Sequence, residues 1–252
     1  MAKGSREPNR DDYKESTPET RPRPEKLYDF EAGFRKASSR HHFSGNLYYM
    51  YYRDQLILTG QINDVGNPVR TNVKDSYRLG LELSDTYAIS SRWNIGGNLA
   101  LSRNIIPDYT EYVDQYDDEF RFVGQEKTEY KQTEIAFSPA LIGGLNTVFS
   151  PTPAWTFSWE TRYVSRQYMD NTATKNRSID PYSYSNFRFS YERPLLGAEN
   201  VTLALDLRNI FGAAYESSGY TFGYYQGGVR QDFNYYYPQA GFHFLATVNV
   251  RF

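Results

Sequence analysis

The chain contains no cysteine, only 3 histidines, and almost no net charge among its 252 residues. The absence of cysteine excludes disulfide frameworks, thiolate zinc sites and cysteine nucleophiles. Because 28 basic residues face 30 acidic ones, for a formal charge of −2, a large basic face for nucleic acid is not expected. The stability of the fold must therefore come from burial or from strand pairing.

Targeting and membrane-helix signals are also missing. Residues 1–26 are polar, charged and proline-rich, so they do not form a secretion signal with an apolar core. The longest uncharged run, 135–159, is interrupted by Pro139, Pro151 and Pro153, which makes a spanning helix improbable. Aromatic residues are abundant instead, at 17% of the chain, while the mean hydropathy is only −0.71. An aromatic excess on a polar background fits a wall that is apolar on one side only.

Alternation with a period of two residues is the main structural signal. It is clearest at the end of the chain, where Phe244, Ala246, Val248 and Val250 alternate with mostly polar residues. We expect an all-β fold of about nine strands, with a tenth remnant at Ser5–Arg10. The predicted strands lie at 28–34, 43–51, 77–83, 93–101, 141–149, 155–163, 187–191, 201–207 and 242–252. The glycines and Pro139 leave the phase of 141–149 ambiguous.

The predicted connectors alternate in length. The short ones are 37–40, 90–92, 151–154 and 193–200, and the long ones are 54–75, 104–138, 166–181 and 209–240. Outer-membrane barrels have short periplasmic turns and long extracellular loops. The predicted architecture is therefore an antiparallel transmembrane β-barrel segment, with the short turns and the end of the last strand on the periplasmic side.

The two faces of the strands fit lipid on one side. Charged residues such as Glu160, Arg188 and Asp206 fall in the phase opposite to the apolar rows. A charge facing the bilayer midplane costs about 2–4 kcal/mol for Arg or Lys, so this segregation is expected for a wall with a wet or plugged interior. The alternative is a soluble antiparallel sheet with an aromatic core, such as a tyrosine-rich glycan-binding domain.

Several motifs carry a family resemblance over nearly the whole chain. Residues 24–33 look like a Pro-Glu entry into a strand, Asn209-Ile210-Phe211 with Tyr215-Glu216 like the exit of a penultimate strand, and Tyr237-Pro238 with Arg251-Phe252 like a terminal strand. Together they resemble the C-terminal barrel of TonB-dependent outer-membrane receptors, especially those of Bacteroidetes-type bacteria. The resemblance implies that Phe252 is a signal for the barrel assembly machinery.

The sequence departs from that family in its extent. Such receptors have a signal peptide, a TonB-contacting box, a plug and a 22-stranded barrel. If the 252 residues of this chain were divided among 22 strands, each strand would have about eleven residues and nothing would remain for loops. We expect about nine or ten strands of such a barrel, with 1–26 as a remnant strand and extracellular loop and 27–252 as the C-terminal barrel portion. Met1 is then expected to mark a truncated reading frame or an artificial boundary.

The resemblance implies transport without catalysis and without a resident cofactor. The parent protein would lie in the outer membrane, in contact with lipid, and import a scarce ligand such as a ferric siderophore or another metal chelate. Contact with the TonB complex would occur only through the missing plug. This segment would supply barrel wall and ligand-facing loops.

The residues most suited to touch a ligand lie in 209–240, a tyrosine-rich stretch with few charges. Aromatic faces with phenolic hydroxyls suit catecholate rings or sugars, and we predict Tyr225, Arg230 and Tyr235 as ligand contacts. The competing interpretation is that these side chains pack the loops together and form the outer aromatic girdle.

Metal and catalytic sites are not indicated. The acidic stretch 104–138 offers oxygen ligands, but its spacing does not match a calcium loop, so a solvated acidic loop is favoured. His41, His42 and His243 do not form a ligand cluster. Motifs of common enzymes are missing. The strongest enzymatic alternative is a small complete outer-membrane barrel, a protease or phospholipase, with His243 near one rim.

Overall fold

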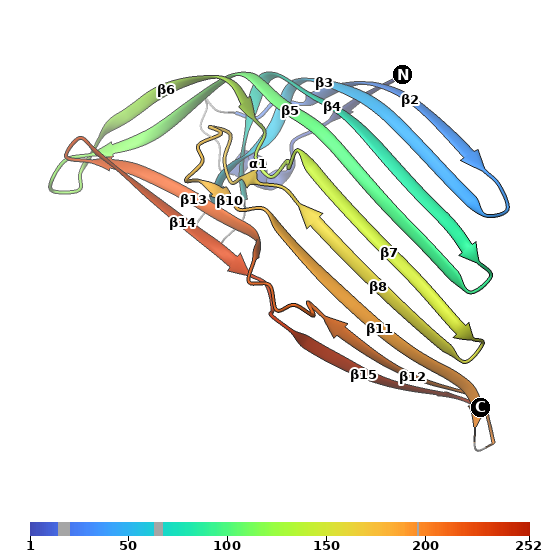
Figure 1. Ribbon diagram of the computed structural model, residues 1–252. Helices are drawn as coiled ribbons and strands as arrows, with labels where there is room; N and C mark the ends of the chain where they lie inside the picture. Colours follow the sequence, from blue (N-terminus) through green and yellow to red (C-terminus); the bar gives the residue numbers. More distant parts are fainter. Residues whose placement is uncertain (15–20, 63–67, 196) are drawn as a thin grey trace.

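The computed structural model describes residues 1–14, 21–62, 68–195 and 197–252. Most of these residues form one large, strongly bent sheet that remains open and is antiparallel except for one short parallel pair, and two short strands form a separate sheet (Figure 1). Its helix α1 (Arg10–Lys14) has five residues, and no helix in the described ranges is long and apolar enough to cross a membrane. The all-β class and the antiparallel wall predicted from the alternation are confirmed.

Ten strands follow one another across the sheet in chain order. Their bounds are β1 (Ala2–Arg6), β2 (Glu25–Ala37), β3 (His41–Ile62), β4 (Pro68–Ser90), β5 (Trp93–Tyr116), β7 (Leu141–Thr152), β8 (Trp155–Val164), β11 (Tyr182–Leu195), β12 (Ala198–Arg208) and β15 (His243–Arg251). The nine predicted strands are all present. The predicted remnant strand is present as well, but it covers Ala2–Arg6 rather than Ser5–Arg10, and it pairs with the start of β2.

The four short turns fall where the alternation predicts them. β2 ends at Ala37 and β3 begins at His41, while β4 ends at Ser90 and β5 begins at Trp93. The turns between β7 and β8 and between β11 and β12 are equally brief, and all four lie at the same end of the sheet (Figure 1). Trp93 and Trp155 begin their strands at this end, with about two-fifths of each side chain exposed. This is the position in which tryptophan is enriched at a membrane interface.

The segments predicted as long loops are largely strand. β5 runs on to Tyr116 and pairs with β6 (Phe122–Glu134), and 209–240 holds the hairpin β13 (Glu216–Gln226) and β14 (Val229–Pro238). Segment 166–181 contains the short pair β9 (Gln167–Tyr168) and β10 (Ser178–Ile179). The prediction missed these ribbons because tyrosine, threonine and paired Lys and Glu side chains stabilise strands above the membrane without an apolar face.

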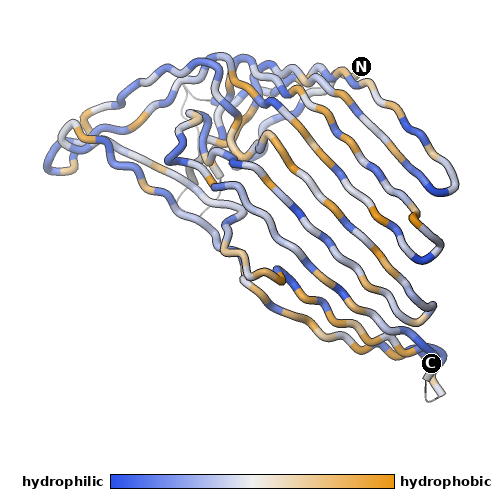
Figure 2. The backbone as a smooth tube through the Cα atoms, in the orientation of Figure 1, coloured by the Kyte–Doolittle hydropathy of each residue, from blue (hydrophilic) through white to orange (hydrophobic). Residues whose placement is uncertain are grey.

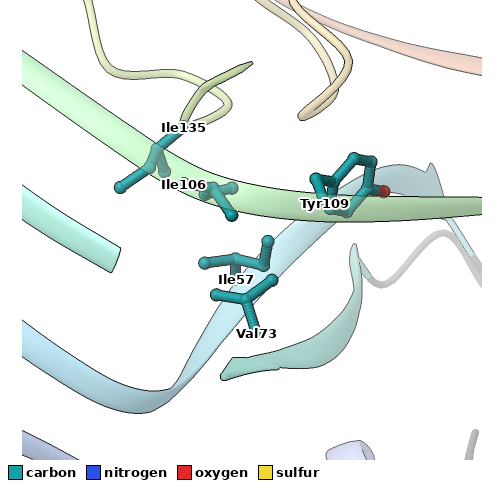
Figure 3. Packing of buried hydrophobic residues seen from close by; sticks show 5 residues of the cluster. All are labelled: Ile57, Val73, Ile106, Tyr109 and Ile135. Atoms are coloured by element: carbon teal, nitrogen blue, oxygen red, sulfur yellow. The ribbon is translucent and has the colours of Figure 1, made fainter. Parts of the chain in front are cut away.

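Burial separates the sheet into two regions. Along the wall the apolar residues alternate with polar ones, and many of the large apolar side chains are exposed (Figure 2). The main buried cluster lies where the extended strands fold over the opposite end of the wall. It consists of Ile57, Val73, Ile106, Tyr109 and Ile135, with Ile106 fully buried (Figure 3).

Candidate functional site

Three segments that are far apart in the sequence meet at the end of the wall opposite the short turns (Figure 1). We call them the cap: the β5–β6 extension (104–138), segment 166–181 and the β13–β14 hairpin (209–240). The tips of the two hairpins join by parallel pairing of Tyr225 with Gln115 and of Gln226 with Tyr116. Segment 166–181 contacts both ribbons, through Arg177 to Glu111 on β5 and through the Asn176 carbonyl to Asn234 on β14.

The β13–β14 hairpin is held at both ends. At its tip, Gly227 and Gly228 both have positive φ, which the tight two-residue turn between twisted strands requires. At its base, Asn209 is left-handed and almost fully buried, and its side-chain amide donates hydrogen bonds to the carbonyls of Ala213 (2.9 Å) and Ala240 (3.1 Å). This clamp gives the Asn-Ile-Phe motif at 209–211 a structural role, because it bends the chain out of the wall.

A buried ionic cluster joins the three segments of the cap. The carboxylate of Glu111 on β5 accepts hydrogen bonds from Arg177 Nη1 (2.7 Å) and from Arg230 Nη2 (2.7 Å). Arg177 also donates to Asp170 (2.6 Å), and Arg230 donates to Asp232 on its own strand (2.9 Å). The side chains of Arg177 and Asp170 are only 6% and 5% exposed, so the charges are compensated by one another rather than by water.

The pKa values of the cluster follow from this environment. Burial would raise the pKa of Glu111, but the guanidinium groups of Arg230 and Arg177 hold it below the ordinary value. Burial dominates at Asp170 and raises its pKa, although Arg177 and Thr172 oppose the shift. Glu111 is therefore the carboxylate that stays ionised most firmly while it binds two cations.

Segment 166–181 is fixed by side-chain amides as well as by charge. Asn171 is fully buried, and its amide donates to the carbonyl of Leu58 on β3 (2.6 Å) while its oxygen accepts from the Ala136 amide (2.9 Å). The Phe137 amide donates to the carbonyl of Tyr168 (2.9 Å). The segment thus contacts strands on both sides of it, and the cap forms a packed layer instead of separate loops.

The predicted ligand residues lie on two faces of the β13–β14 hairpin. Tyr225 and Arg230 are cross-strand partners, and the guanidinium carbon of Arg230 lies 5.8 Å from the Tyr225 ring centroid, on the face toward Glu111. Tyr235 pairs with Tyr220 on the opposite face, where their rings stack at 4.9 Å. The structure brings the first two together and separates the third. Tyr235 is 45% exposed, whereas Arg230 is committed to Glu111 and Asp232.

Sequence reasoning missed most of the ionic cluster. Glu111 is one of several acidic residues in 104–138, and neither Asp170 nor Arg177 belongs to a recognisable motif. Glu111 is separated from Arg177 by 66 positions and from Arg230 by 119, so only the folded chain brings these charges together. Elsewhere on β5–β6, Asp108 pairs with Lys131 and Asp114 with Gln125. Over the described ranges, no group of three or more His, Asp and Glu side chains is placed to hold a metal ion.

The polar side of the wall carries the charged residues of the alternate phase. A concavity of about 1090 Å³ is lined there in part by Glu82, Asn98, Asn146, Glu160 and Arg162. Asp206 on β12 binds Arg188 at 2.9 Å and Arg208 at 3.3 Å. Pairing among the charges of this face, as the alternation suggests, accounts for Arg188 and Arg208. Phe252 follows β15 and is 87% exposed, and its role in assembly stays a prediction.

A long-stranded antiparallel sheet with one apolar face, one charged face, short turns at one end and a cap at the other is the wall of an outer-membrane β-barrel. The family model of the TonB-dependent receptor-like β-barrel matches residues 2–210. The chain therefore belongs to the TonB-dependent receptor family of Gram-negative outer-membrane proteins.

Solved structures of this fold are similar at low sequence identity. The copper transporter OprC has a TM-score of 0.64 at 16% identity, over 99% of this chain and 36% of its own. The ferric-catecholate import receptor Fiu from E. coli K12 has a TM-score of 0.60 at 16% identity, over 92% and 28%. The ferric yersiniabactin uptake receptor FyuA from Yersinia pestis has a TM-score of 0.61 at 14% identity, over 88% and 29%.

The chain spans about a third or less of the length of these three receptors. A comparison with curated proteins gives no match. The similar structures are receptors and transporters, and the resemblance at this identity concerns the fold.

Proposed function

We propose that the chain supplies wall and ligand-facing cap to an energy-coupled outer-membrane importer of a scarce metal chelate, with a ferric siderophore as the first candidate. The observation that supports this most is the placement of a packed, tyrosine-rich cap at one end of a wall that has one polar and one apolar side. The similar structures include receptors for ferric catecholate and ferric yersiniabactin and a copper transporter. The proposed role is transport rather than catalysis.

The open edges of the sheet bear on how the wall works. Among the described residues, β1 and β15 each pair on one side only. Unpaired backbone groups in hydrocarbon cost several kcal/mol each, so a wall in the outer membrane needs further strands against both edges. We infer that such strands complete the barrel, that the barrel assembly machinery inserts it, and that TonB acts through a plug held against the charged face.

Tyr225, Arg230 and Tyr235 remain our proposed ligand contacts. Arg230 offers a planar guanidinium beside an aromatic ring, which suits an anionic chelate with flat rings. A chelate that displaces Glu111 from Arg230 would gain a charge-assisted hydrogen bond at the place where the two hairpins join. Tyr235 faces the other way, so one ligand touches all three residues only if it meets the hairpin at its β14 edge.

The test is chelate binding by the full-length protein in detergent, measured with radiolabelled ferric catecholate, ferric citrate and a copper chelate. A triple alanine variant of Tyr225, Arg230 and Tyr235 should bind the preferred chelate about tenfold more weakly, which corresponds to about 1.4 kcal/mol. The matched control replaces Tyr112, Arg121 and Phe122, which are exposed at the tip of the β5–β6 extension. Equal affinity of both variants would remove the three residues from the site.

A further inference from the structure

Four glycines gather in the wall on the neighbouring strands β5 and β7. Gly96 and Gly97 pair with Asn146 and Leu145, and Gly144 pairs with Asn98. Gly143 lies opposite Leu99. Glycine weakens a strand interior and often marks a place where another group approaches closely. Each of the four therefore needs a physical reason.

For the two glycines on the charged face, Gly96 and Gly144, the reason is the space taken by a neighbouring side chain. A Cβ at Gly96 would lie 2.6 Å from Oδ1 of Asn146, and a Cβ at Gly144 would lie 2.7 Å from Oδ1 of Asn98. The two asparagine side chains thus lie across the glycines of the partner strand. Here a side chain on the glycine would have to displace the asparagine of the partner strand.

The apolar face is different. Gly143 belongs to the row of apolar residues that faces lipid, and a Cβ there would meet nothing closer than Asn98 O and Leu99 Cδ1, both at 3.9 Å. Gly97 is tighter, at 3.1 Å from the mobile end of Leu145 and 3.2 Å from the Gly144 carbonyl. Packing within the chain does not require glycine at 143, so the space above it is left open on the outside of the wall.

This space is an apolar groove of about 610 Å³. Gly97 and Gly143 form part of its floor, and its sides include Phe43, Tyr87, Ile95, Leu99, Leu145 and Tyr163. The volume lies within the range of about 300–1,000 Å³ typical of sites for small ligands. An exposed groove with this lining takes an alkyl chain better than any polar molecule.

The groove runs from the periplasmic side of the wall toward the bilayer midplane. Gly97 follows Trp93, at the start of β5, by four residues, or roughly 13 Å along a strand. At a tilt near 45° this is roughly 9 Å in depth, against an apolar band of about 25 Å. The neighbouring lipid is therefore that of the periplasmic leaflet.

Cationic side chains lie at the outer end of the groove, next to the short turns. Lys36 on β2 is exposed and stands across from Phe43, and Arg40 is exposed in the following turn. The acid at this end, Asp85, is part of the groove lining and lies 2.6 Å from Nε2 of His41, with which it forms an ion pair when the imidazole is protonated. The exposed cations Lys36 and Arg40 outnumber Asp85 at this rim, so its balance of charge favours an anion. The combination of an apolar groove and a cationic rim matches one acyl chain and the phosphate of a single lipid.

We propose that this groove binds one anionic glycerophospholipid of the periplasmic leaflet, with an acyl chain over Gly97 and Gly143 and its phosphate at Lys36 and Arg40. The bound lipid fills the gap in the apolar face where the wall has no side chains of its own. The proposal depends on the outer-membrane location and is independent of which chelate is imported.

The test is native mass spectrometry of the full-length protein with equimolar phosphatidylglycerol and phosphatidylcholine. One phosphatidylglycerol should be retained, and Gly143→Leu, which fills the groove, should lower the retained fraction about tenfold. Ala32→Leu adds the same bulk to the apolar row of β2 outside the groove and should leave retention unchanged. Heat-modifiable gel mobility shows whether Gly143→Leu assembles. If it does not, Gly143→Ala should still lower retention, since its Cβ occupies part of the groove without a clash inside the chain.

A second variant tests the contact with the lipid head group. Exchanging Lys36 and Arg40 together for glutamine should keep a lipid bound but abolish the preference for phosphatidylglycerol over phosphatidylcholine. Equal lipid retention in wild type and Gly143→Leu would overturn the groove site, and an unchanged preference in the glutamine variant would overturn the phosphate contact. A dimer that Gly143→Leu dissociates would show that a second copy of the chain, and not lipid, occupies the groove.

Discussion

The wall and the cap of this protein are stabilised in opposite ways. Along the wall, Leu203 and Val248 face each other across β12 and β15, and both remain exposed in the isolated sheet. In the cap, Ile106 is fully buried and Arg177 is nearly so, and each is enclosed by the chain itself. The exposed apolar side chains of the wall are stabilised by contact with lipid. The cap, in contrast, contains its own apolar core and the counter-charges of its buried ions. The membrane thus stabilises the wall, and the chain itself stabilises the cap.

The strongest test of the cap is Glu111→Gln in the full-length protein. It leaves Arg177 and Arg230 without their shared carboxylate, and removing one partner of a buried ion pair costs about 3–5 kcal/mol. Hydrogen exchange in 166–181 and 229–238 should rise steeply while β12 and β15 stay protected. Glu129→Gln is the control, since its exposed pair with Lys127 contributes little. Similar exchange in both variants would show that the cluster does not hold the cap together.

The corresponding test of the wall is Leu203→Arg. Its side chain faces the hydrocarbon, where arginine costs about 2–4 kcal/mol at the midplane, so urea unfolding in bilayers should shift by that amount. Thr202→Arg, on the neighbouring inward position of the same strand, should shift it far less. If both variants are equally destabilised, the two faces of the wall have been assigned wrongly. Neither variant should alter exchange in the cap.

Acid should distinguish the cap from the wall through a smaller effect than that of either substitution. The pKa of Glu111 is lowered in the folded cap, so its stabilisation is complete above the ordinary carboxyl range and is lost as the pH falls through the lowered pKa. Asp170 has a raised pKa, so the folded cap takes up its proton more readily, and protonation of Asp170 does not destabilise it. Exchange in 166–181 should therefore increase only below about pH 4.5. An increase that persists in Glu111→Gln would assign the effect to another group.

The wall could be predicted from sequence and the cap could not. Alternation at 201–207 and 242–252 specifies both a strand and the side it buries, because one face must be apolar throughout in lipid. The same reasoning failed at 104–138, where β5 and β6 continue as a ribbon with polar residues on both faces. Tyr225 and Arg230 lie together as cross-strand partners, but Tyr235 lies on the other face because it is five positions, an odd offset, from Arg230 on the same strand. That these three residues contact a ligand stays a prediction.

The sequence by itself determined the class of fold, the positions of the nine wall strands and the short turns, and the division into lipid and interior faces. These features depend on local alternation and on turn residues, which any segment carries within itself. Only the tertiary structure decided which distant charges meet at Glu111 and where glycines on β5 and β7 combine into one groove. Both depend on register between strands and on the bending of hairpins over the wall, which a single strand does not encode.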